Sequence, residues 1–423
     1  MEQREDVQQE SLLRRIGPGL ITAAVVIGPG SIVASSSAGA EGEYRLVWVL
    51  LLGFLFMATF TAMGARLACA IPGTPLQYVA SRWGRPLAAI TGLSAFLVTA
   101  GFQFGNNIGA SVSLAGITPI PAWTWALFFT ALALVFLLRA RHVYKMLEQV
   151  MIALVFVMLG AFVANLIWTG VNIPGLLAGV IPRPVPDAEP AWGALPRIFT
   201  DTEATTARAM LATTFSAVAA FYMAYLGHEK GWTAANAKRA IGDSWIGISF
   251  LAIIALIILI SAAEALFGLD RDFTNVGELA EQLRAVLGDW ATLIFSLGLA
   301  AASFSSFIAN ALIGGALMAD GLGQYKGIGS KAVKAWTAGV MLVGCLVAIL
   351  TMSLGFGSTP SLLIAQAATL IAAPLCAILL YILTCSRSVM GELRNPWPVI
   401  AIGAVGLIVV GTLNAQTVIR WLT

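Results

Sequence analysis

The chain has 423 residues, of which 59% are hydrophobic and only 11% are charged, with a net charge of +3 at pH 7. An ordinary soluble domain carries about 25% charged residues, so this composition excludes a soluble fold, a disordered chain, a coiled coil and a nucleic-acid-binding surface. With a mean hydropathy of +0.87, we expect an all-α integral membrane protein.

Eleven apolar stretches follow one another along the chain, and each is close to or longer than the roughly 20 residues that cross a bilayer. We expect eleven transmembrane helices, at 16–40, 45–69, 86–116, 121–138, 146–171, 205–227, 240–268, 288–319, 332–353, 358–384 and 397–421. Residues 172–204 form the longest loop. This loop separates a first group of five helices, 16–171, from a second group, 205–384, and the helix at 397–421 follows as an extra one.

The basic residues alternate from loop to loop. If the N-terminus is cytoplasmic, the inner segments hold 17 of the 24 Lys and Arg residues and the outer segments hold 7. Loops that stay in the cytoplasm carry the excess of positive charge, and a spurious or missing span would scramble the alternation. We therefore expect a multi-pass protein of the cell membrane with a cytoplasmic tail at 1–15, an extracytoplasmic loop at 172–204 and an extracytoplasmic C-terminus.

A helix-breaking sequence, Gly28-Pro29-Gly30-Ser31, lies in the middle of the first span. Proline removes a backbone donor and glycine adds backbone freedom. Backbone groups that are freed at membrane depth must line a cavity inside the protein. A simple kink is the alternative interpretation of the same residues. The sixth span occupies the corresponding place in the second group but has no proline, so its composition does not predict a break.

Several short motifs, in their order and spacing, are similar to those of one family of membrane proteins. They are Ile16-Gly17-Pro18-Gly19, Ala38-Gly39-Ala40 with Tyr44-Arg45-Leu46-Val47-Trp48, Met146-Leu147-Glu148-Gln149-Val150, Gln366, and Ser386-Arg387-Ser388-Val389-Met390-Gly391-Glu392-Leu393. Over nearly the whole chain they resemble the Nramp family (natural resistance-associated macrophage proteins), which are proton-coupled divalent metal transporters. The resemblance implies a LeuT-like fold of two inverted five-helix repeats plus one helix, with helices 1 and 6 broken around the ion.

The chain departs from this family at the metal ligands. The family's Asp-Pro-Gly-Asn motif is matched by Gly28-Pro29-Gly30-Ser31, and its Met-Pro-His motif by Ala220-Phe221-Tyr222, although a three-residue shift would bring Met223 to that place. Acidic residues of the third span are matched by Gln103 and Asn106, and only Gln366 is kept. A dication without a carboxylate partner is costly to bury, so we expect no metal site and no proton path through the third span.

The groups that replace the metal ligands favour another cargo. A half-helix that begins near Gly30 would present free N–H groups that attract an anion, and aromatic rings would cover the rest of a solute. We therefore expect a secondary transporter that works by alternating access and carries a small organic solute, anionic or zwitterionic. The expected substrate-binding residues are Gly28, Pro29, Gly30, Ser31, Gln103, Asn106, Ala220, Phe221, Tyr222 and Gln366.

Two other functions stay open. A permease for Mg²⁺ or Mn²⁺ could carry a still-hydrated ion with few direct ligands, and a transport-inactive membrane receptor would need no cargo. An enzyme is not expected, because the chain has no H-E-x-x-H or G-x-S-x-G motif. The expected partners are the solute and the lipid bilayer, without a cofactor or nucleic acid, and the expected state is a monomer.

Overall fold

The computed structural model describes residues 28–138, 141–185, 198–269, 273 and 275–422. Every regular element within these residues is a helix. The α-helices are α3 (Pro29–Gly42), α4 (Val47–Ala70), α5 (Pro75–Trp83), α6 (Arg85–Ala115), α7 (Ala122–Leu138), α8 (Arg141–Thr169), α9 (Ile173–Ala178), α10 (Asp201–Thr214), α11 (Ala217–Glu229), α12 (Ala237–Leu266), α13 (Arg284–Leu287), α14 (Ala291–Gly321), α15 (Lys331–Ser353), α16 (Ser358–Ala372), α17 (Pro374–Cys385), α18 (Arg387–Met390) and α19 (Trp397–Leu422). Four 3₁₀ turns lie between them, η1 (Ala234–Asn236), η2 (Val276–Leu283), η3 (Gly288–Trp290) and η4 (Gly391–Leu393).

Nine helical segments in the described part of the chain are long and apolar enough to cross a membrane. The expected fourth span is the 17-residue helix α7, which falls just below that length. The first half of the expected first span, 16–27, lies outside the described residues. The all-helical membrane architecture is therefore confirmed, whereas the count of eleven spans stays a prediction.

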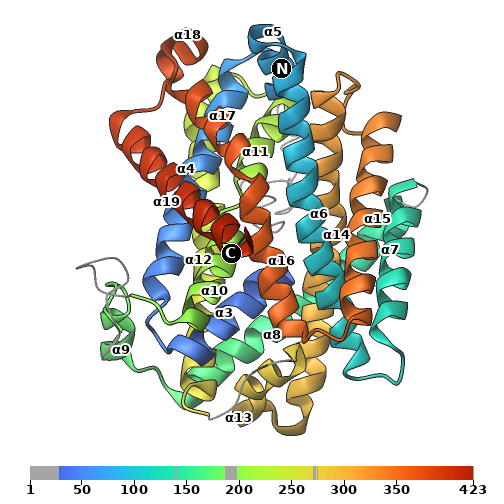
Figure 1. The fold of residues 1–423 in the computed structure, drawn as a ribbon, viewed down its shortest axis with the longest axis vertical. Coiled ribbons are helices and arrows are strands. Elements are labelled where there is room, and N and C mark those ends of the chain that lie inside the picture. The colour runs from blue at the N-terminus through green and yellow to red at the C-terminus, as the bar shows by residue number, and fades with distance from the viewer. Residues whose placement is uncertain (1–27, 139–140, 186–197, 270–272, 274, 423) are drawn as a thin grey trace, which may run out of the picture.

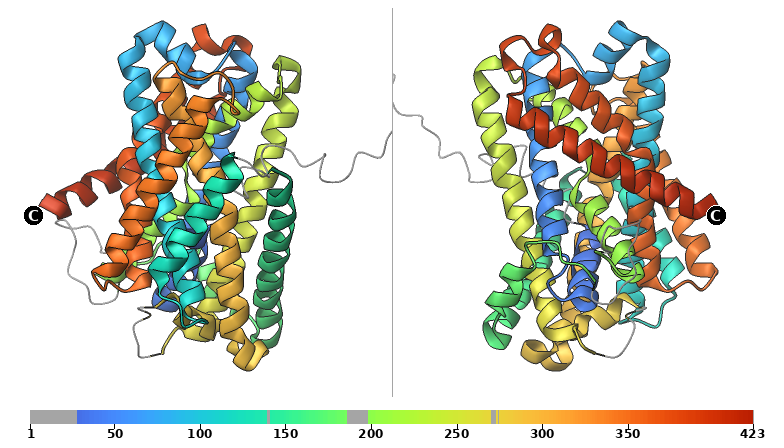
Figure 2. Two further views of the ribbon diagram at one scale, coloured as in Figure 1. Left: turned by 90° about the vertical axis from the view of Figure 1, so that its right-hand side faces the viewer. Right: turned by 60° about the vertical axis from the view of Figure 1, so that its left-hand side comes forward.

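The long helices run side by side along the long axis of the molecule (Figure 1). The short helices α5 and α18 lie at one end, here named the α5 end, and α9 and α13 lie at the opposite end, named the α13 end. Helix α19 crosses the others obliquely and packs on α4, α16 and α17 (Figure 2).

Helices α6 and α14 form a close central pair because glycines let their backbones approach. A Cβ on Gly92 would lie 2.7 Å from the carbonyl oxygen of Leu317, and one on Gly321 would lie 2.6 Å from that of Ala88. Helices α7, α8 and α15 have many exposed apolar side chains, such as Ile167 and Leu350. These faces suit lipid, and the helices that carry them enclose the interior of the bundle.

Helices α3, α10 and α11 are almost completely buried and therefore form the interior. Contacts at the α13 end join α3 and the turn after it to α10. Arg45 Nε lies 2.8 Å from Glu203 Oε1 in an ion pair, and Thr206 Oγ1 donates to Glu41 Oε2 at 2.6 Å. These contacts hold α3 and α10 as neighbours, so that the inner ends of both helices reach the same level of the bundle.

Candidate functional site

Helix α3 begins directly after Gly28. This residue is extended, with φ −117° and ψ −178°, and α3 begins at the next residue with Pro29 in its first turn. Proline fits that position because the first-turn N–H groups have no helical partner in any case. The backbone N–H groups of Ser31 and Ile32 both donate to the carbonyl oxygen of Gly28, at 3.2 and 3.3 Å. The breaker residues thus stand at the start of α3; the segment before them, 16–27, lies outside the described residues, so a break within the first span stays a prediction.

The second break lies between α10 and α11, at Phe215 and Ser216. Their backbone angles are φ −103°, ψ 84° and φ −89°, ψ 92°, both outside the helical region. The N–H of Phe215 closes α10 on the carbonyl of Leu211 at 2.7 Å, and Ser216 Oγ accepts from the N–H of Ala219 at 3.4 Å as the N-cap of α11. The C-terminal end of α10, which carries partial negative charge, therefore lies at the break.

A small cavity lies between the start of α3 and this break and is closed by α6, α14 and α16. Its free volume is about 20 Å³, which is room for one or two water molecules. Residues Gly28, Pro29, Gly30, Ser31, Phe102, Asn106, Thr213, Ser216, Asn310 and Gln366 line it. Six of the ten expected substrate-binding residues are therefore brought together at one place.

Gln366 of α16 is wedged between two glycines. A Cβ on Gly30 would lie 2.5 Å from Gln366 Cδ, and one on Gly105 of α6 would lie 2.4 Å from Gln366 Nε2. The side chain is 2% exposed, and its Oε1 has no hydrogen-bond partner among the described residues. A buried acceptor without a partner is costly, so this oxygen is available to a ligand that enters the cavity.

Asn106 and Gln103 lie on the same helix, α6, but differ in their position relative to the cavity. Asn106 lines the cavity, and its Nδ2 donates to Gln103 Oε1 at 3.4 Å. Gln103 does not line the cavity; its stem packs on Gly344 of α15, where a glycine Cβ would lie 2.7 Å from Gln103 Cβ. Gln103 therefore orients Asn106 from behind, and the expectation that it borders the cavity was wrong.

The expected boundary of the cavity in the sixth span was also wrong. Ala220, Phe221 and Tyr222 lie inside α11, beyond the break, and none of them lines the cavity. They are buried, with Tyr222 stacked on Tyr225 at 5.8 Å between ring centroids. The physical reason is that a serine N-cap ends the break at Ser216, a signal that a search for proline and glycine overlooks.

Four residues that line the cavity were not singled out from the sequence: Phe102, Thr213, Ser216 and Asn310. Thr213 and Ser216 flank the break that lacks proline, and their hydroxyl groups are the signal that could have found them. Phe102 and Asn310 lie in the regular helices α6 and α14, and no local pattern distinguishes them from packing residues.

None of the residues that the structure describes in the cavity wall has an ionisable side chain. Its polar groups are hydroxyls and carboxamides, together with helix ends of opposite sign. The N-termini of α3 and α11 bring partial positive charge, and the C-terminus of α10 brings partial negative charge. The wall thus offers neutral oxygen atoms to a ligand, and its backbone does not favour one sign of charge.

Within the described residues, the break between α10 and α11 and the start of α3 meet around a polar cavity, an arrangement typical of the LeuT-like fold. The profile of the family described as "Natural resistance-associated macrophage protein-like" matches residues 19–420. The chain belongs to this family, the Nramp family, as its motifs predicted.

Curated relatives and solved structures agree with this assignment. The chain is 23% identical over 415 residues to "Divalent metal cation transporter MntH" of Chromohalobacter salexigens, covering 96% of this chain and 91% of the relative. It is 23% identical over 421 residues to the protein of the same name in Aeromonas hydrophila subsp. hydrophila, covering 96% of each chain. A crystal structure of the Eremococcus coleocola manganese transporter superposes with a TM-score of 0.77 at 18% identity, over 98% of this chain and 87% of that one.

These comparisons contradict the organic solute as cargo, because the relatives are named for divalent metal cations and manganese. The prediction considered only the N-terminus of the half-helix that begins near Gly30, whose partial positive charge favours an anion. The N-terminus of α3 lies at the cavity, but the last turn of α10, which contributes Thr213, lies there as well. The cavity is also too small for an organic solute. A pocket for an organic ligand has a volume of about 300–1,000 Å³, whereas this cavity has a free volume of about 20 Å³.

Proposed function

We propose that the protein is a divalent metal cation permease that works by alternating access and binds its ion at the two helix breaks. The observation that carries the proposal is the convergence of neutral oxygen groups from five helices on a cavity of ion size, in a chain of the Nramp family. The names of the curated relatives support the same class of cargo.

The chemistry of the wall favours a hard cation. Its oxygen donors are the side chains of Ser31, Asn106, Thr213, Ser216, Asn310 and Gln366. Among the described residues of the wall, none carries a thiol, thioether or imidazole. Mg²⁺ and Mn²⁺ suit carbonyl and water oxygens, whereas softer transition metals gain from sulfur and imidazole. We therefore assign Mg²⁺ and Mn²⁺ as the cargo.

Water molecules complete the coordination in this proposal. Mg²⁺ loses its hydration shell reluctantly and usually keeps several waters when protein ligands are few. The cavity has room for one or two waters beside its oxygen donors. A retained water spreads the charge of the ion over neighbouring hydroxyls and amides, which lowers the cost of binding a dication without a carboxylate.

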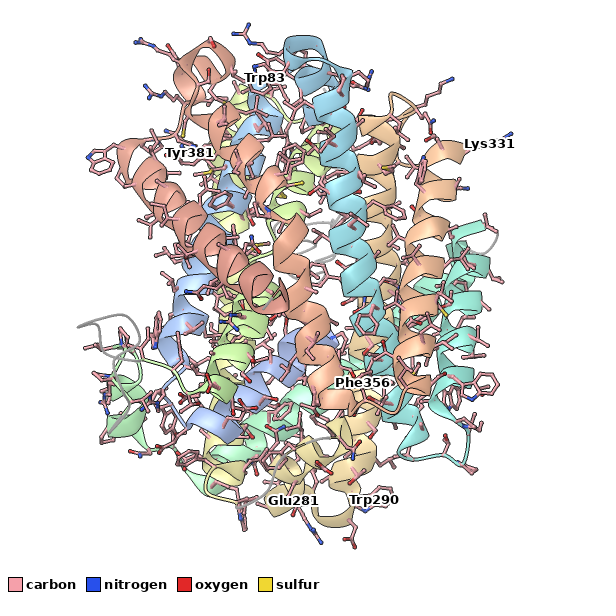
Figure 3. The ribbon with its side chains drawn as sticks, viewed as in Figure 1. Trp83, Glu281, Trp290, Lys331, Phe356 and Tyr381 are labelled. Carbon is pink, nitrogen blue, oxygen red and sulfur yellow. The ribbon has the colours of Figure 1, made fainter. Side chains whose placement is uncertain are left out.

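We place the α5 end in the cytoplasm of the cell and the α13 end outside. Lys331 and Trp83 lie at the α5 end, whereas Glu281 and Trp290 lie at the α13 end (Figure 3). The tryptophans suit the two membrane interfaces, and basic residues accumulate on the cytoplasmic side. In the same frame the N-terminal tail is cytoplasmic, the location is the cell membrane, and the working unit is a monomer.

The test is cation uptake into proteoliposomes that contain the purified full chain. A dye inside the vesicles reports Mg²⁺ or Mn²⁺, and calorimetry measures binding to the protein in detergent. We expect saturable uptake of both ions in the wild type. Asn106→Ala and Gln366→Ala should each weaken binding about tenfold or more, because each removes one oxygen ligand.

A matched control is Asn165→Ala. Asn165 is also a buried amide, but it donates to Ser261 Oγ at 3.1 Å between α8 and α12, away from the cavity. Its loss should lower stability and leave the affinity for the ion unchanged. Equal loss of affinity in all three variants, or no binding of either ion by the wild type, would contradict the proposal.

A further inference from the structure

Asp320 is a fully buried carboxylate outside the ion cavity. It lies in the last turn of α14, near the α5 end, and is 0% exposed. Its Oδ2 accepts hydrogen bonds from Thr74 Oγ1 and from the phenol of Tyr225, both at 2.6 Å. Its Oδ1 has no hydrogen-bond partner among the described residues. One carboxylate therefore joins three elements: α14, the N-cap of α5, and α11.

Helix α11 connects this carboxylate to the ion cavity. The helix begins one residue after Ser216, which lines the cavity, and Tyr225 lies nine residues further along, about 13 Å at 1.5 Å per residue. The intervening side chains fill the interior: Phe221 and Tyr222 are buried, and both rings pack on Tyr225. The aromatic group formed by Phe221, Tyr222 and Tyr225 thus closes the bundle between the cavity and the α5 end.

Few other charged or titratable groups face Asp320. From α6, Arg85 Nη1 donates to the backbone carbonyl of Asp320 at 3.0 Å. From the loop after α14, Tyr325 packs edge-on against Tyr225 and donates to Glu229 Oε1 at 2.7 Å. Burial and the Glu229 carboxylate raise the pKa of Tyr325 well above its ordinary value, so this phenol stays neutral at physiological pH. The set then holds two carboxylates that acid can protonate, Asp320 and Glu229; Asp320 accepts from Tyr225 of α11, whereas Glu229 accepts from Tyr325 of the loop.

We propose that Asp320 is a proton-binding positioning residue: its ionised carboxylate holds α11 and α5 against α14 and keeps the α5 end closed, and its protonation on Oδ1 releases α11. An ionised carboxylate only accepts hydrogen bonds and binds hydroxyl donors more strongly than a neutral acid does. Protonation therefore weakens both contacts to Oδ2 at once. The lining residues that the structure describes include no titratable group, so in this proposal acid acts on the opening of the α5 end and leaves these ligands unchanged.

The test measures opening directly, without any cation. In a background with Cys69→Ser and Cys385→Ser, a reporter cysteine is placed in α11 by Ala224→Cys, at a residue that is 1% exposed. A separate protein carries Ser388→Cys, at an exposed residue of the same end. The ratio of maleimide labelling rates at the two sites removes the effect of pH on the thiol itself. We expect this ratio to rise about tenfold between about pH 8 and about pH 5.

Three variants show whether Asp320 acts through the charge of its carboxylate or only through its packing in the fold. With Asp320→Asn, the ratio should be high and independent of pH. With Tyr225→Phe, which removes one donor to the ionised form, the midpoint of the pH profile should move to higher pH. With Glu229→Gln, a carboxylate at the same end that binds Tyr325, the pH response should persist.

A flat ratio in the wild type, or a pH response that survives Asp320→Asn, would overturn the inference. If Asp320→Asn does not fold, the profile of Tyr225→Phe decides, because a purely structural residue would leave the midpoint where it is. The inference rests on the proposed function in one respect: the permease gives the opening of the α5 end its purpose, which is to release the ion. The proton binding of Asp320 itself does not depend on that function. A wild-type pH response without cation uptake would reject the permease and keep the proton-binding role of Asp320.

Discussion

Because Gln366 is packed tightly between two glycines, the substitution Gly105→Ala, which adds one methyl group, tests the geometry of the site. In Gly105→Ala the new Cβ would lie 2.4 Å from Gln366 Nε2, closer than side chains tolerate, and the amide cannot retreat because Gly30 lies against its other face. Overpacking of this kind costs about 1–3 kcal/mol. Alanine gains about 1 kcal/mol of helix propensity over glycine. The net loss of stability should therefore be about 0–2 kcal/mol.

The overpacking energy of Gly105→Ala should disappear when the side chain of Gln366 is removed. With Gln366→Ala already present, Gly105→Ala meets open space and only its gain in helix propensity remains. The difference between the two backgrounds, about 1–3 kcal/mol, is a coupling energy that a double-mutant cycle isolates. Thermal unfolding of the four proteins in one detergent, at one scan rate, measures it. Gly160→Ala in α8, where nothing lies within 4 Å of the new carbon, is the matched control and should be neutral or stabilising.

Additive effects of Gly105→Ala and Gln366→Ala would refute the reasoning, because they would show that the two residues do not touch in the folded protein. Cation uptake gives an independent check. Gly105→Ala should lower uptake even where stability changes little, since a displaced amide no longer presents its Oε1 to the cavity. Uptake at the wild-type rate in this variant would mean that the amide is not a ligand.

Three further outcomes follow from the same geometry. Gly28→Asp should tighten Mn²⁺ binding about tenfold or more in calorimetry, since a Cβ there would meet its neighbours at 3.4 Å and beyond; unchanged affinity would separate this position from the ion. Gly109→Ala should slow cation uptake in proteoliposomes, because its Cβ would lie 2.4 Å from the Cβ of Pro29 and displace the start of α3; an unaltered rate would argue against a fixed break. Glu203→Gln should destabilise the protein by about 1–3 kcal/mol through loss of its ion pair with Arg45; an unshifted melting temperature would show that the pair contributes nothing.

The sequence predicted those parts of the fold that depend on composition and local backbone chemistry. Low charge and long apolar stretches indicated a helical membrane protein, and the motifs identified the family. These two predictions succeeded because each rests on residues whose physical effect is local or on a pattern shared by relatives. The pair Pro29-Gly30 stands at the start of α3, and Gln366 and Asn106 line the cavity, but their role in binding stays a prediction.

The remainder depends on contacts between distant segments. The second break has no proline or glycine, and a serine cap takes their place. Composition therefore did not predict this break, and Ala220, Phe221 and Tyr222, matched through the resemblance, lie inside α11. Asn310 reaches the cavity only because α14 packs closely on α6. The sign of the charge on the transported solute could not be predicted either, because it depends on which helix ends meet at one point in space.

The residues that the structure describes in the cavity wall carry no ionisable group, and this has a consequence for the proposed ion site. A site built on carboxylates or imidazoles competes with protons, and its ligands are lost as the surroundings become acidic. Hydroxyls and carboxamides neither gain nor lose a proton in that range. Under the proposed function, the affinity of these groups for the ion would therefore be the same in acid as at neutral pH, and it would be limited by hydration rather than by acidity.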